Sequence, residues 1–416
     1  MLKTKNFIYL DYAATTPVDK EVLKEMLPYF SDKFGNASSI HFFGQEAIAA
    51  IDESREKIAK LFDCDFSEII FTGSATESNN LAIKGLIGKI LEFEFQITAN
   101  FSSRKNLRLT SKNTKTLHII STNIEHESVH ESLKELEKAG HEITYLKVDK
   151  NGLISIADLE KNIKNNTLLV SVIYANNEIG TIQPIKEIGK LLEKINTKRK
   201  EQGLNRIYFH TDAVQALQFF ECRPDWLKVD FMTFSGHKIY GPKGIGGLYV
   251  RKNTPLVPII FGGGQEFNLR SGTENVASIV GLAKAVELVF KNREARFKHV
   301  LNLRDKLLDY IMKNNGKINI NGSLKNRLPN NLNIRFHDIS NETLLVALDQ
   351  AGLSISAGSA CSARALGVSR VLTAVGLSEK QAEESIRITL GKDTSKKEIK
   401  KAAEIINKIL RQWIIR

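Results

Sequence analysis

The chain has 416 residues, of which 42% are hydrophobic and 25% are charged, and its formal net charge is +12. This balance excludes a wholly disordered chain, because such chains combine low hydrophobicity with high net charge. No apolar run approaches the ~18 residues of a membrane span, so a transmembrane protein is excluded as well. At ~150 residues per domain, the length predicts two or three domains.

The three cysteines, Cys64, Cys222 and Cys361, are far apart and odd in number. They exclude a disulfide framework and a CxxC metal site, and we expect no metal. Residues 7–11 form a strand-like run near the start of the chain, with no signal-peptide core or transit segment before it. We therefore expect a cytoplasmic protein in a reducing compartment.

The excess of basic residues is spread along the whole chain. One interpretation is an acidic partner such as nucleic acid. The other is a set of lysine-rich helix faces that are simply solvated. The even spread favours the second interpretation, so we do not expect direct binding of nucleic acid.

In chain order, short apolar runs alternate with amphipathic stretches. Strands are predicted at residues 68–72, 117–122, 142–148, 167–173, 206–211, 229–234 and 247–251. Helices are predicted at residues 76–91, 126–139, 156–163 and 185–195. Most of the strands lack polar alternation, which is typical of strands buried on both faces. The pattern predicts a doubly wound α/β domain with a mainly parallel, seven-stranded sheet.

The regular alternation stops near residue 262. Beyond it we predict a helix at about 275–312, short strands at 318–321 and 331–336, and helices at 342–350 and 396–413. We expect a large α/β domain of residues 16–262 and a smaller α+β domain of residues 1–15 and 263–416. Residues 93–115 look like an insertion, and their second half has five basic and no acidic residues, which predicts an exposed loop.

Lys238 lies just beyond the end of a predicted strand, in the segment SGHKIYGPKG (235–244). Ligands bind at that edge of open α/β sheets. A lysine there can form a Schiff base with an aldehyde cofactor. The alternative is an ordinary surface lysine in a glycine-rich turn.

Asp212 also follows an apolar strand, 26 residues earlier. An acid in that place can keep a pyridine nitrogen protonated, which makes pyridoxal phosphate an electron sink. The alternative is a helix N-cap. The pairing of Asp212 with Lys238 favours the cofactor.

A third feature is the segment TGSATES (72–78), between a strand and a helix. Backbone N–H groups at a helix N-terminus, with a threonine hydroxyl, form an anion site. The alternative, a capping box of Ser74 with Glu77, is compatible with that role.

Nine motifs extend these features over nearly the whole chain: LDYAATTP (10–17), ATES (75–78), EH (125–126), NNEIG (176–180), TDAVQ (211–215), SGHK (235–238), RSGTEN (270–275), GSAC (358–361) and SIR (385–387). In this order they resemble the cysteine desulfurases, the NifS/IscS-like branch of the class V aminotransferase group. The resemblance implies a pyridoxal phosphate-dependent transferase fold of the aspartate aminotransferase type, and a homodimer.

The resemblance also implies roles for individual residues. Lys238 would bind the cofactor and move the substrate Cα proton, Asp212 would pair with the pyridine nitrogen, and Gln215 with the phenolic oxygen. His126 would stack on the cofactor ring and take part in catalysis. The implied phosphate ligands are Ala75, Thr76, Ser235, His237 and, from the neighbouring subunit, Thr273. Asn177 and Arg387 would bind the substrate carboxylate, and Asn177 would also contact the cofactor. A planar guanidinium suits that last task, because it can grip a carboxylate with two hydrogen bonds.

Cys361 lies among small residues, in SAGSACSAR (356–364), which argues against a buried structural cysteine. We interpret Cys64 and Cys222 as packed apolar cysteines. The resemblance implies that Cys361 is the catalytic nucleophile on a mobile loop of the longer, NifS/IscS-like form. Three departures are a Gly73–Ser74 order that is reversed in the phosphate turn, the insertion, and a C-terminal docking tail that we expect to be absent.

The implied reaction removes sulfur from L-cysteine, giving L-alanine and a persulfide on Cys361. Acceptor proteins would use the sulfur for iron–sulfur cluster assembly or tRNA thiolation. One alternative is another reaction of the same group, an aminotransferase or selenocysteine lyase, and transamination needs no nucleophilic thiol. Another is a basic nucleic-acid-binding or sulfur-relay scaffold, against which the Lys238–Asp212 pair argues.

Overall fold

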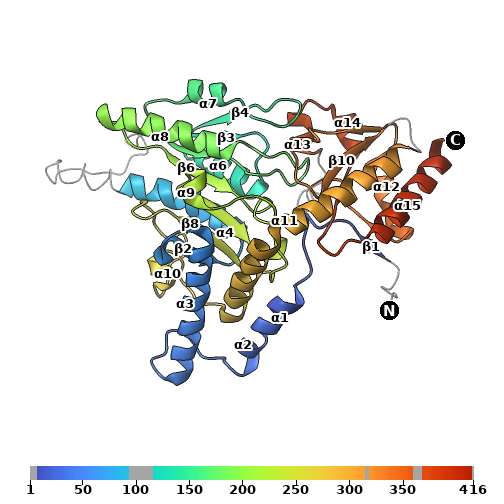
Figure 1. The fold of residues 1–416 in the computed structure, drawn as a ribbon. Helices are drawn as coiled ribbons and strands as arrows, with labels where there is room; N and C mark the ends of the chain where they lie inside the picture. Colours follow the sequence, from blue (N-terminus) through green and yellow to red (C-terminus); the bar gives the residue numbers. More distant parts are fainter. Residues whose placement is uncertain (1–6, 93–115, 314–317, 359–367, 415–416) are drawn as a thin grey trace.

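The structure is a computed structural model that describes residues 7–92, 116–313, 318–358 and 368–414. Its main sheet has seven strands in the order β2-β8-β7-β6-β5-β3-β4 (Figure 1). They are β2 (Ile69–Thr72), β3 (His118–Thr122), β4 (Glu142–Leu146), β5 (Thr167–Ser171), β6 (Tyr208–Asp212), β7 (Phe231–Ser235) and β8 (Gly246–Val250). β8 runs antiparallel to β2 and β7, and the other neighbours are parallel. The predicted α/β fold is confirmed.

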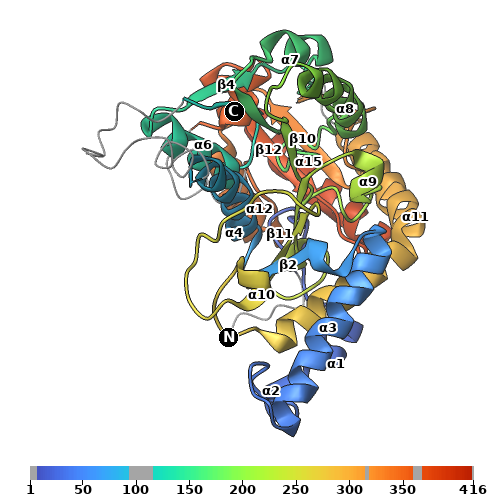
Figure 2. The ribbon, with the colours of Figure 1, turned by 90° about the vertical axis from the view of Figure 1, so that its left-hand side faces the viewer.

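Helices cover both faces of this sheet (Figures 1 and 2) because its strands are apolar on both sides. In β7, for example, Phe231 and Met232 point into different hydrophobic clusters. One face carries α3 (Phe42–Phe62), α8 (Ile185–Glu201) and the first half of α11 (Val276–Met312); the other carries α4 (Ala75–Asn80), the π-helical turn η3 (Leu81–Gly85) and α6 (Glu127–Lys138).

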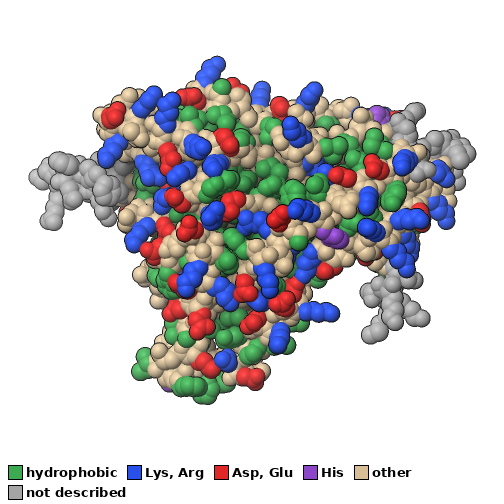
Figure 3. Space-filling view, viewed as in Figure 1, with side chains coloured by type: hydrophobic (Ala, Val, Ile, Leu, Met, Phe, Trp, Pro, Cys, Tyr) green, Lys and Arg blue, Asp and Glu red, His purple; other side chains and the backbone are tan. Residues whose placement is uncertain are grey.

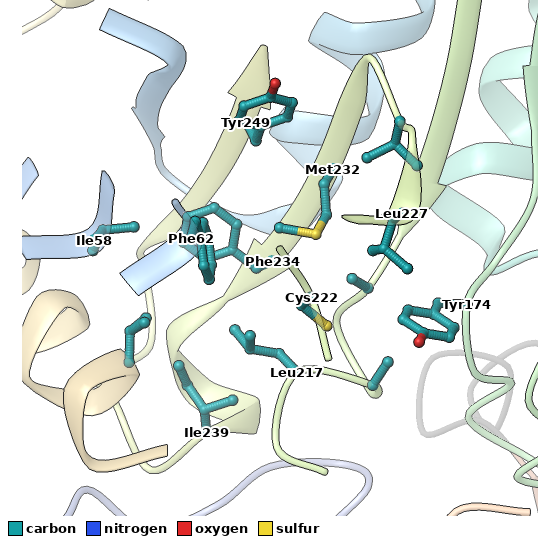
Figure 4. Close-up of a cluster of buried hydrophobic side chains, with 14 of the residues drawn as sticks. Ile58, Phe62, Tyr174, Leu217, Cys222, Leu227, Met232, Phe234, Ile239 and Tyr249 are labelled. Atoms are coloured by element: carbon teal, nitrogen blue, oxygen red, sulfur yellow. The ribbon is translucent and has the colours of Figure 1, made fainter. Parts of the chain in front are cut away.

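The core between the sheet and α3 is centred on aromatic side chains. The rings of Phe62 and Phe234 meet edge to face, with centroids 5.2 Å apart (Figure 4). Gly247 is required beside them, since a Cβ there would lie 2.2 Å from the Phe234 ring. Cys222 packs in the same cluster, as predicted, whereas Cys64 is only partly buried.

A second unit is built on a three-stranded antiparallel sheet, β12 (Ser385–Thr389), β10 (Asn331–Phe336) and β9 (Ile318–Ile320). Its separate apolar core is completed by α12 (Asn341–Gln350), α15 (Lys396–Ile414) and the second half of α11. The start of the chain joins this unit, because β1 (Ile8–Tyr9) pairs with β11 (Leu353–Ser354) and Asp11 forms a bridge with Thr389. The 37-residue α11 therefore connects the two cores.

The predicted strands and most of the predicted helices agree with the structure to within a few residues, but α8 ends six residues later than predicted. The first helices were not predicted. These are α1 (Lys20–Met26), α2 (Pro28–Ser31) and α3. The other elements are α7 (Ile156–Asn162), α9 (Pro224–Leu227), α10 (Gln265–Asn268), α13 (Arg370–Ala374), α14 (Glu379–Glu383), η2 (Phe66–Glu68) and η4 (Gly236–Lys238). The predicted loop at 93–115 lies outside the described residues. None of the described helices has the length and apolar character that a membrane crossing requires.

The segment labelled α10 contains a left-handed turn, with φ values of 48°, 58° and 65° at Glu266, Phe267 and Asn268. Such values are costly for residues other than glycine. A buried ion pair holds the turn: Arg55 of α3 lies 2.7 Å from the Glu266 carboxylate. The same carboxylate accepts the backbone N–H of Phe71 at 2.8 Å. The pair thus ties α3, β2 and the turn together.

Candidate active site

A cavity of about 180 Å³ lies at the edge of the main sheet where β5, β6 and β7 end. Its wall is formed by Ala13, Ala14, Ser74, Ala75, Thr76, His126, Ile173, Asn177, Asp212, Val214, Gln215, Ser235, His237, Lys238 and Arg387. The structure therefore brings together the predicted site residues, with two exceptions. Thr273 is exposed and does not line this cavity, and Cys361 lies outside the described residues.

Lys238 reaches the cavity from η4, the single turn that follows β7. Gly236 makes this turn possible, since a Cβ there would come within 2.7 Å of the Pro242 carbonyl oxygen. The Lys238 amine donates to the carbonyl oxygens of Ala13 at 2.6 Å and Ala14 at 2.7 Å. The N-terminal segment thus orients the amine.

Asp212 is the last residue of β6 and is buried. Its Oδ1 accepts the backbone N–H of Val214 at 3.0 Å, and its Oδ2 accepts from Asn79 Nδ2 at 2.9 Å. The first of these bonds closes a local turn, and no described helix begins at Asp212, so the alternative of a helix N-cap is not realised. Gln215, three residues on, donates to the Ala13 carbonyl at 3.0 Å.

The turn between β2 and α4 places Ala75 and Thr76, the first two residues of the helix, at the cavity wall. The first N–H groups of a helix have no partner within the helix itself. Ser74 caps the helix by accepting the Glu77 N–H at 3.2 Å. The Glu77 carboxylate reaches back to the N–H of Gly73 at 2.8 Å, one residue earlier than in the predicted capping box. A Cβ on Gly246 would lie 2.6 Å from the Ser74 carbonyl carbon, so the turn packs directly on β8.

Two histidines line the cavity. His126 is the N-cap of α6, and its Nδ1 accepts the backbone N–H of Ser128 at 3.2 Å. His237 Nδ1 lies 3.2 Å from the Thr15 hydroxyl. Burial, reinforced by the nearby positive charge of Lys238, lowers the pKa of His237 to about 4. His237 is therefore neutral at physiological pH.

Arg387 lies on β12 and is buried, although it is charged. Its Nη1 donates to the Asn177 carbonyl at 2.9 Å, and its Nη2 donates to Asp11 Oδ1 at 2.7 Å. Its buried Nε has no hydrogen-bond partner among the described residues. A buried unpaired donor is costly, so this guanidinium is suited to receive an anion from the cavity.

Sequence reasoning missed the parts played by Asp11, Ala13, Ala14 and Asn79. The LDYAATTP segment (10–17) belongs to the motifs, but a backbone carbonyl carries no sequence signal that it will contact Lys238. The resemblance implies no role for Glu125 either. It is fully buried, and burial raises its pKa to about 8.

The two cysteines in the described part of the chain, Cys64 and Cys222, are poor nucleophiles. Burial, with nearby acidic groups, raises the pKa of the Cys64 thiol to about 12. Burial likewise raises the pKa of Cys222 to about 12. Because the thiolate is the reactive form, neither side chain is activated.

Comparisons with known proteins agree on one family. Residues 8–100 and 104–401 match the family model described as aminotransferase class-V. The chain is 43% identical to cysteine desulfurase IscS of Dictyoglomus turgidum over 406 residues, which cover 98% of this chain and 95% of that protein. Among solved structures, it is similar to a NifS-like protein with a TM-score of 0.84 and 36% identity, covering 98% of this chain and 100% of the other. A structure of SspA in complex with cysteine has a TM-score of 0.75 and 39% identity, covering 92% and 98% of the two chains.

Proposed function

The chain belongs to the class V aminotransferase family and is a cysteine desulfurase, and from this premise we propose how its residues divide the work. The observation that carries the proposal is the convergence of an amine, a buried acid and a buried guanidinium on one cavity. These are Lys238, Asp212 and Arg387. A reaction at the Cα of an amino acid needs a group that carries the Cα proton, a partner for the cofactor and a ligand for the substrate carboxylate. Lys238, Asp212 and Arg387 suit these three tasks in that order.

Pyridoxal phosphate is the cofactor that the family implies, and the cavity residues fit it. The N–H groups of Ala75 and Thr76, together with Ser235 and His237, are suited to the phosphate. Asp212 suits the pyridine nitrogen, Gln215 the phenolic oxygen, and His126 and Asn177 the ring. When bound, the cofactor would draw electrons away from the substrate Cα.

Lys238 is the residue that we assign to covalent attachment of the cofactor and to proton transfer. Its amine is held by the Ala13 and Ala14 carbonyls on the cavity side of η4. The same amine would take the proton from the substrate Cα. Arg387 and Asn177 would hold the substrate carboxylate and so fix the Cα near that amine.

The sulfur would leave as a persulfide on Cys361. Attack of the Cys361 thiolate on the substrate sulfur forms an S–S bond and breaks the C–S bond, whose electron pair stays with the carbon skeleton. A proton replaces sulfur on that carbon, so the products are L-alanine and the persulfide, with no external oxidant. The high pKa of both Cys64 and Cys222 supports this assignment.

A second copy of the chain is the partner that we propose for an exposed apolar tip. The tip consists of Phe30, Phe34, Ile40, Phe42 and Phe43, on α2, the start of α3 and the segment between them. Ile40 is 94% exposed, and the lower end of the molecule in Figure 3 shows hydrophobic side chains at this place. Exposed apolar clusters of this kind are typical of interfaces. In a homodimer, the exposed Thr273 would reach the phosphate site of the other subunit.

The persulfide would pass to acceptor proteins for iron–sulfur cluster assembly or tRNA thiolation. A reducing, cytoplasmic setting suits a reaction that depends on a free thiolate.

The direct test is to add L-cysteine to the purified protein and to measure sulfide, in the presence of a reductant, together with alanine. Equal amounts of both products are expected. Pyruvate or a keto acid in place of alanine would contradict the proposal.

A further inference from the structure

A chain of hydrogen bonds joins Asp212 to His126 through two side chains without an assigned role, Asn79 and Ser128. Asn79 is fully buried near the end of α4, and Ser128 is the second residue of α6. Asn79 Nδ2 lies 2.9 Å from Asp212 Oδ2 and 2.8 Å from Ser128 Oγ. Ser128 Oγ lies 2.8 Å from His126 Nδ1. The π-helical turn η3 begins two residues after Asn79, and such turns are frequent at functional sites.

The donors and acceptors at the Asp212 end are set by the carboxylate. A carboxylate oxygen only accepts, so Asn79 must turn its NH₂ group towards Asp212. This orientation is kept although Asn79 Oδ1 is buried without a partner among the described residues. One N–H of Asn79 is used by Asp212, and the other donates to the hydroxyl oxygen of Ser128.

The donors and acceptors at the His126 end are set by the backbone. The N–H of Ser128 can only donate, and it points at His126 Nδ1 from 3.2 Å. Nδ1 is therefore an acceptor. The Ser128 hydroxyl oxygen accepts a hydrogen bond from Asn79, and its O–H donates a hydrogen bond to the same Nδ1. A neutral imidazole carries one proton, and here that proton lies on Nε2.

We propose that Asn79 and Ser128 are positioning residues that hold His126 as the tautomer protonated at Nε2 and tie its ring to the carboxylate of Asp212. This inference rests on the roles proposed for His126 and Asp212. It means that His126 meets the reacting groups as a hydrogen-bond or proton donor. It also means that a movement of Asp212 changes the position of His126, and the reverse.

The tautomer is measured directly by the Cδ2 chemical shift of ¹³C-labelled histidine in the full-length protein, with His126→Gln to assign the signal. We expect the Nε2-protonated form in the wild type, both before and after cofactor is added. In Ser128→Ala, the ratio of the Nδ1-protonated to the Nε2-protonated form should rise by about threefold to tenfold, the equivalent of one ordinary hydrogen bond. Ser132→Ala is the matched control, since Ser132 is a buried serine one turn further along α6 that donates to the Ser128 carbonyl at 2.8 Å.

Kinetics give a second readout. Ser128→Ala should lower kcat by about threefold to tenfold with KM for L-cysteine unchanged, because Arg387 holds the substrate carboxylate. Ser128→Thr keeps the hydroxyl and should restore both kcat and the tautomer. If Ser128→Ala does not fold, Asn79→Asp removes the two donors at the other end of the chain and should move the tautomer in the same way.

An Nδ1-protonated His126 in the wild type would overturn the inference. So would an unchanged tautomer in both Ser128→Ala and Asn79→Asp, or an equal change in Ser132→Ala. The measurement without cofactor separates this inference from the proposed function. The expected tautomer can be found even if no sulfide is formed, and sulfide can be formed even if the tautomer differs from the expected one.

Discussion

Asp11 and Arg387 are 376 residues apart in the sequence, and they form an ion pair with Asp11 Oδ1 2.7 Å from Arg387 Nη2. The other oxygen of Asp11 accepts the hydroxyl of Ser356 at 3.2 Å. Asp11 thus orients the guanidinium through Nη2, while the buried Nε has no hydrogen-bond partner in the part of the chain that the structure describes. The orientation of Arg387 depends on both ends of the chain.

Arg387→Lys should raise KM for L-cysteine by roughly 10- to 100-fold with a smaller change in kcat, because an ammonium cannot reproduce the planar two-bond grip on a carboxylate. Steady-state kinetics measure this effect. Arg335→Lys is the control: Arg335 lies on the neighbouring strand and binds Glu384 at 2.6 Å. The KM of Arg335→Lys for L-cysteine should stay near that of the wild type. Equal effects of the two variants would show that the KM depends on the integrity of the small sheet and not on the guanidinium of Arg387.

Lys238→Ala should abolish turnover. Borohydride reduction of the wild type followed by peptide mapping should find the cofactor on Lys238. Lys243→Ala, an exposed lysine five residues further along the same glycine-rich segment, should keep both activity and labelling. Cofactor fixed to any other lysine would refute the assignment.

Cys361→Ser should still bind cofactor and L-cysteine but release almost no sulfide, because the thiol is needed only to accept the sulfur. Mass spectrometry of the wild type after incubation with L-cysteine should show one added sulfur on Cys361. Cys64→Ser and Cys222→Ala are the controls, and both should retain sulfide release. An added sulfur on either of those residues would contradict the proposal.

Glu125→Gln should stabilise the protein increasingly as the pH rises from about 5 to 8. The pKa of Glu125 is raised by burial to about 8 from an ordinary value of 4.5. Between these values the folded state keeps a proton that the unfolded state has lost, so stability falls as pH rises, by on the order of 5 kcal/mol in total. Glutamine does not titrate, so the free energy of unfolding of Glu125→Gln should not fall with pH for this reason.

Urea midpoints at pH 5, 6.5 and 8 measure the difference between Glu125→Gln and the wild type. Glu384→Gln is a matched control, because Glu384 is also buried but is paired with Arg335 at 2.6 Å. That variant should be destabilised at all three pH values. A constant difference between Glu125→Gln and the wild type would show that Glu125 is ionised in the folded protein.

Phe34→Glu in the apolar tip should shift the protein from dimer to monomer, because a carboxylate would lose its hydration in an apolar interface. Sedimentation velocity measures the change. Val346→Glu on α12, which replaces an apolar residue that is 59% exposed, should leave the dimer intact. A monomeric wild type would contradict the proposed dimer. A Phe34→Glu variant that remains dimeric would show that the dimer interface does not include the apolar tip.

The sheet was predictable from sequence because its strands are continuous apolar runs, and Lys238 and Asp212 because each directly follows such a run. Helix α3 was not predicted, because polar Ser54 and Arg55 interrupt its buried face. Arg55 is buried only because it meets Glu266, 211 residues later. Local periodicity cannot reveal a partner that tertiary packing supplies.

The same limit applies in the site. Residue types near strand ends pointed to Lys238, Asp212 and the turn at 72–78, and the family resemblance implied most of the remaining cavity wall. Neither indicated the use of Asn79, whose partner Asp212 lies 133 residues away. An asparagine in a helix carries no sign of its partner. Nor did the sequence show that the Ala13 carbonyl would accept from both Lys238 and Gln215, since every residue has the same carbonyl group.

The bridge between Asp11 and Thr389 has a consequence for biosynthesis. The ribosome makes the N-terminal wall of the cavity first and β12, with its arginine, among the last elements. At about 5 to 20 residues per second, roughly 20 to 80 s separate the two. Within that interval all strands of the main sheet are translated, but Arg387, the residue proposed to bind the substrate carboxylate, is not. With the role proposed for Arg387, a nascent chain would therefore be inactive until almost all of it has been translated.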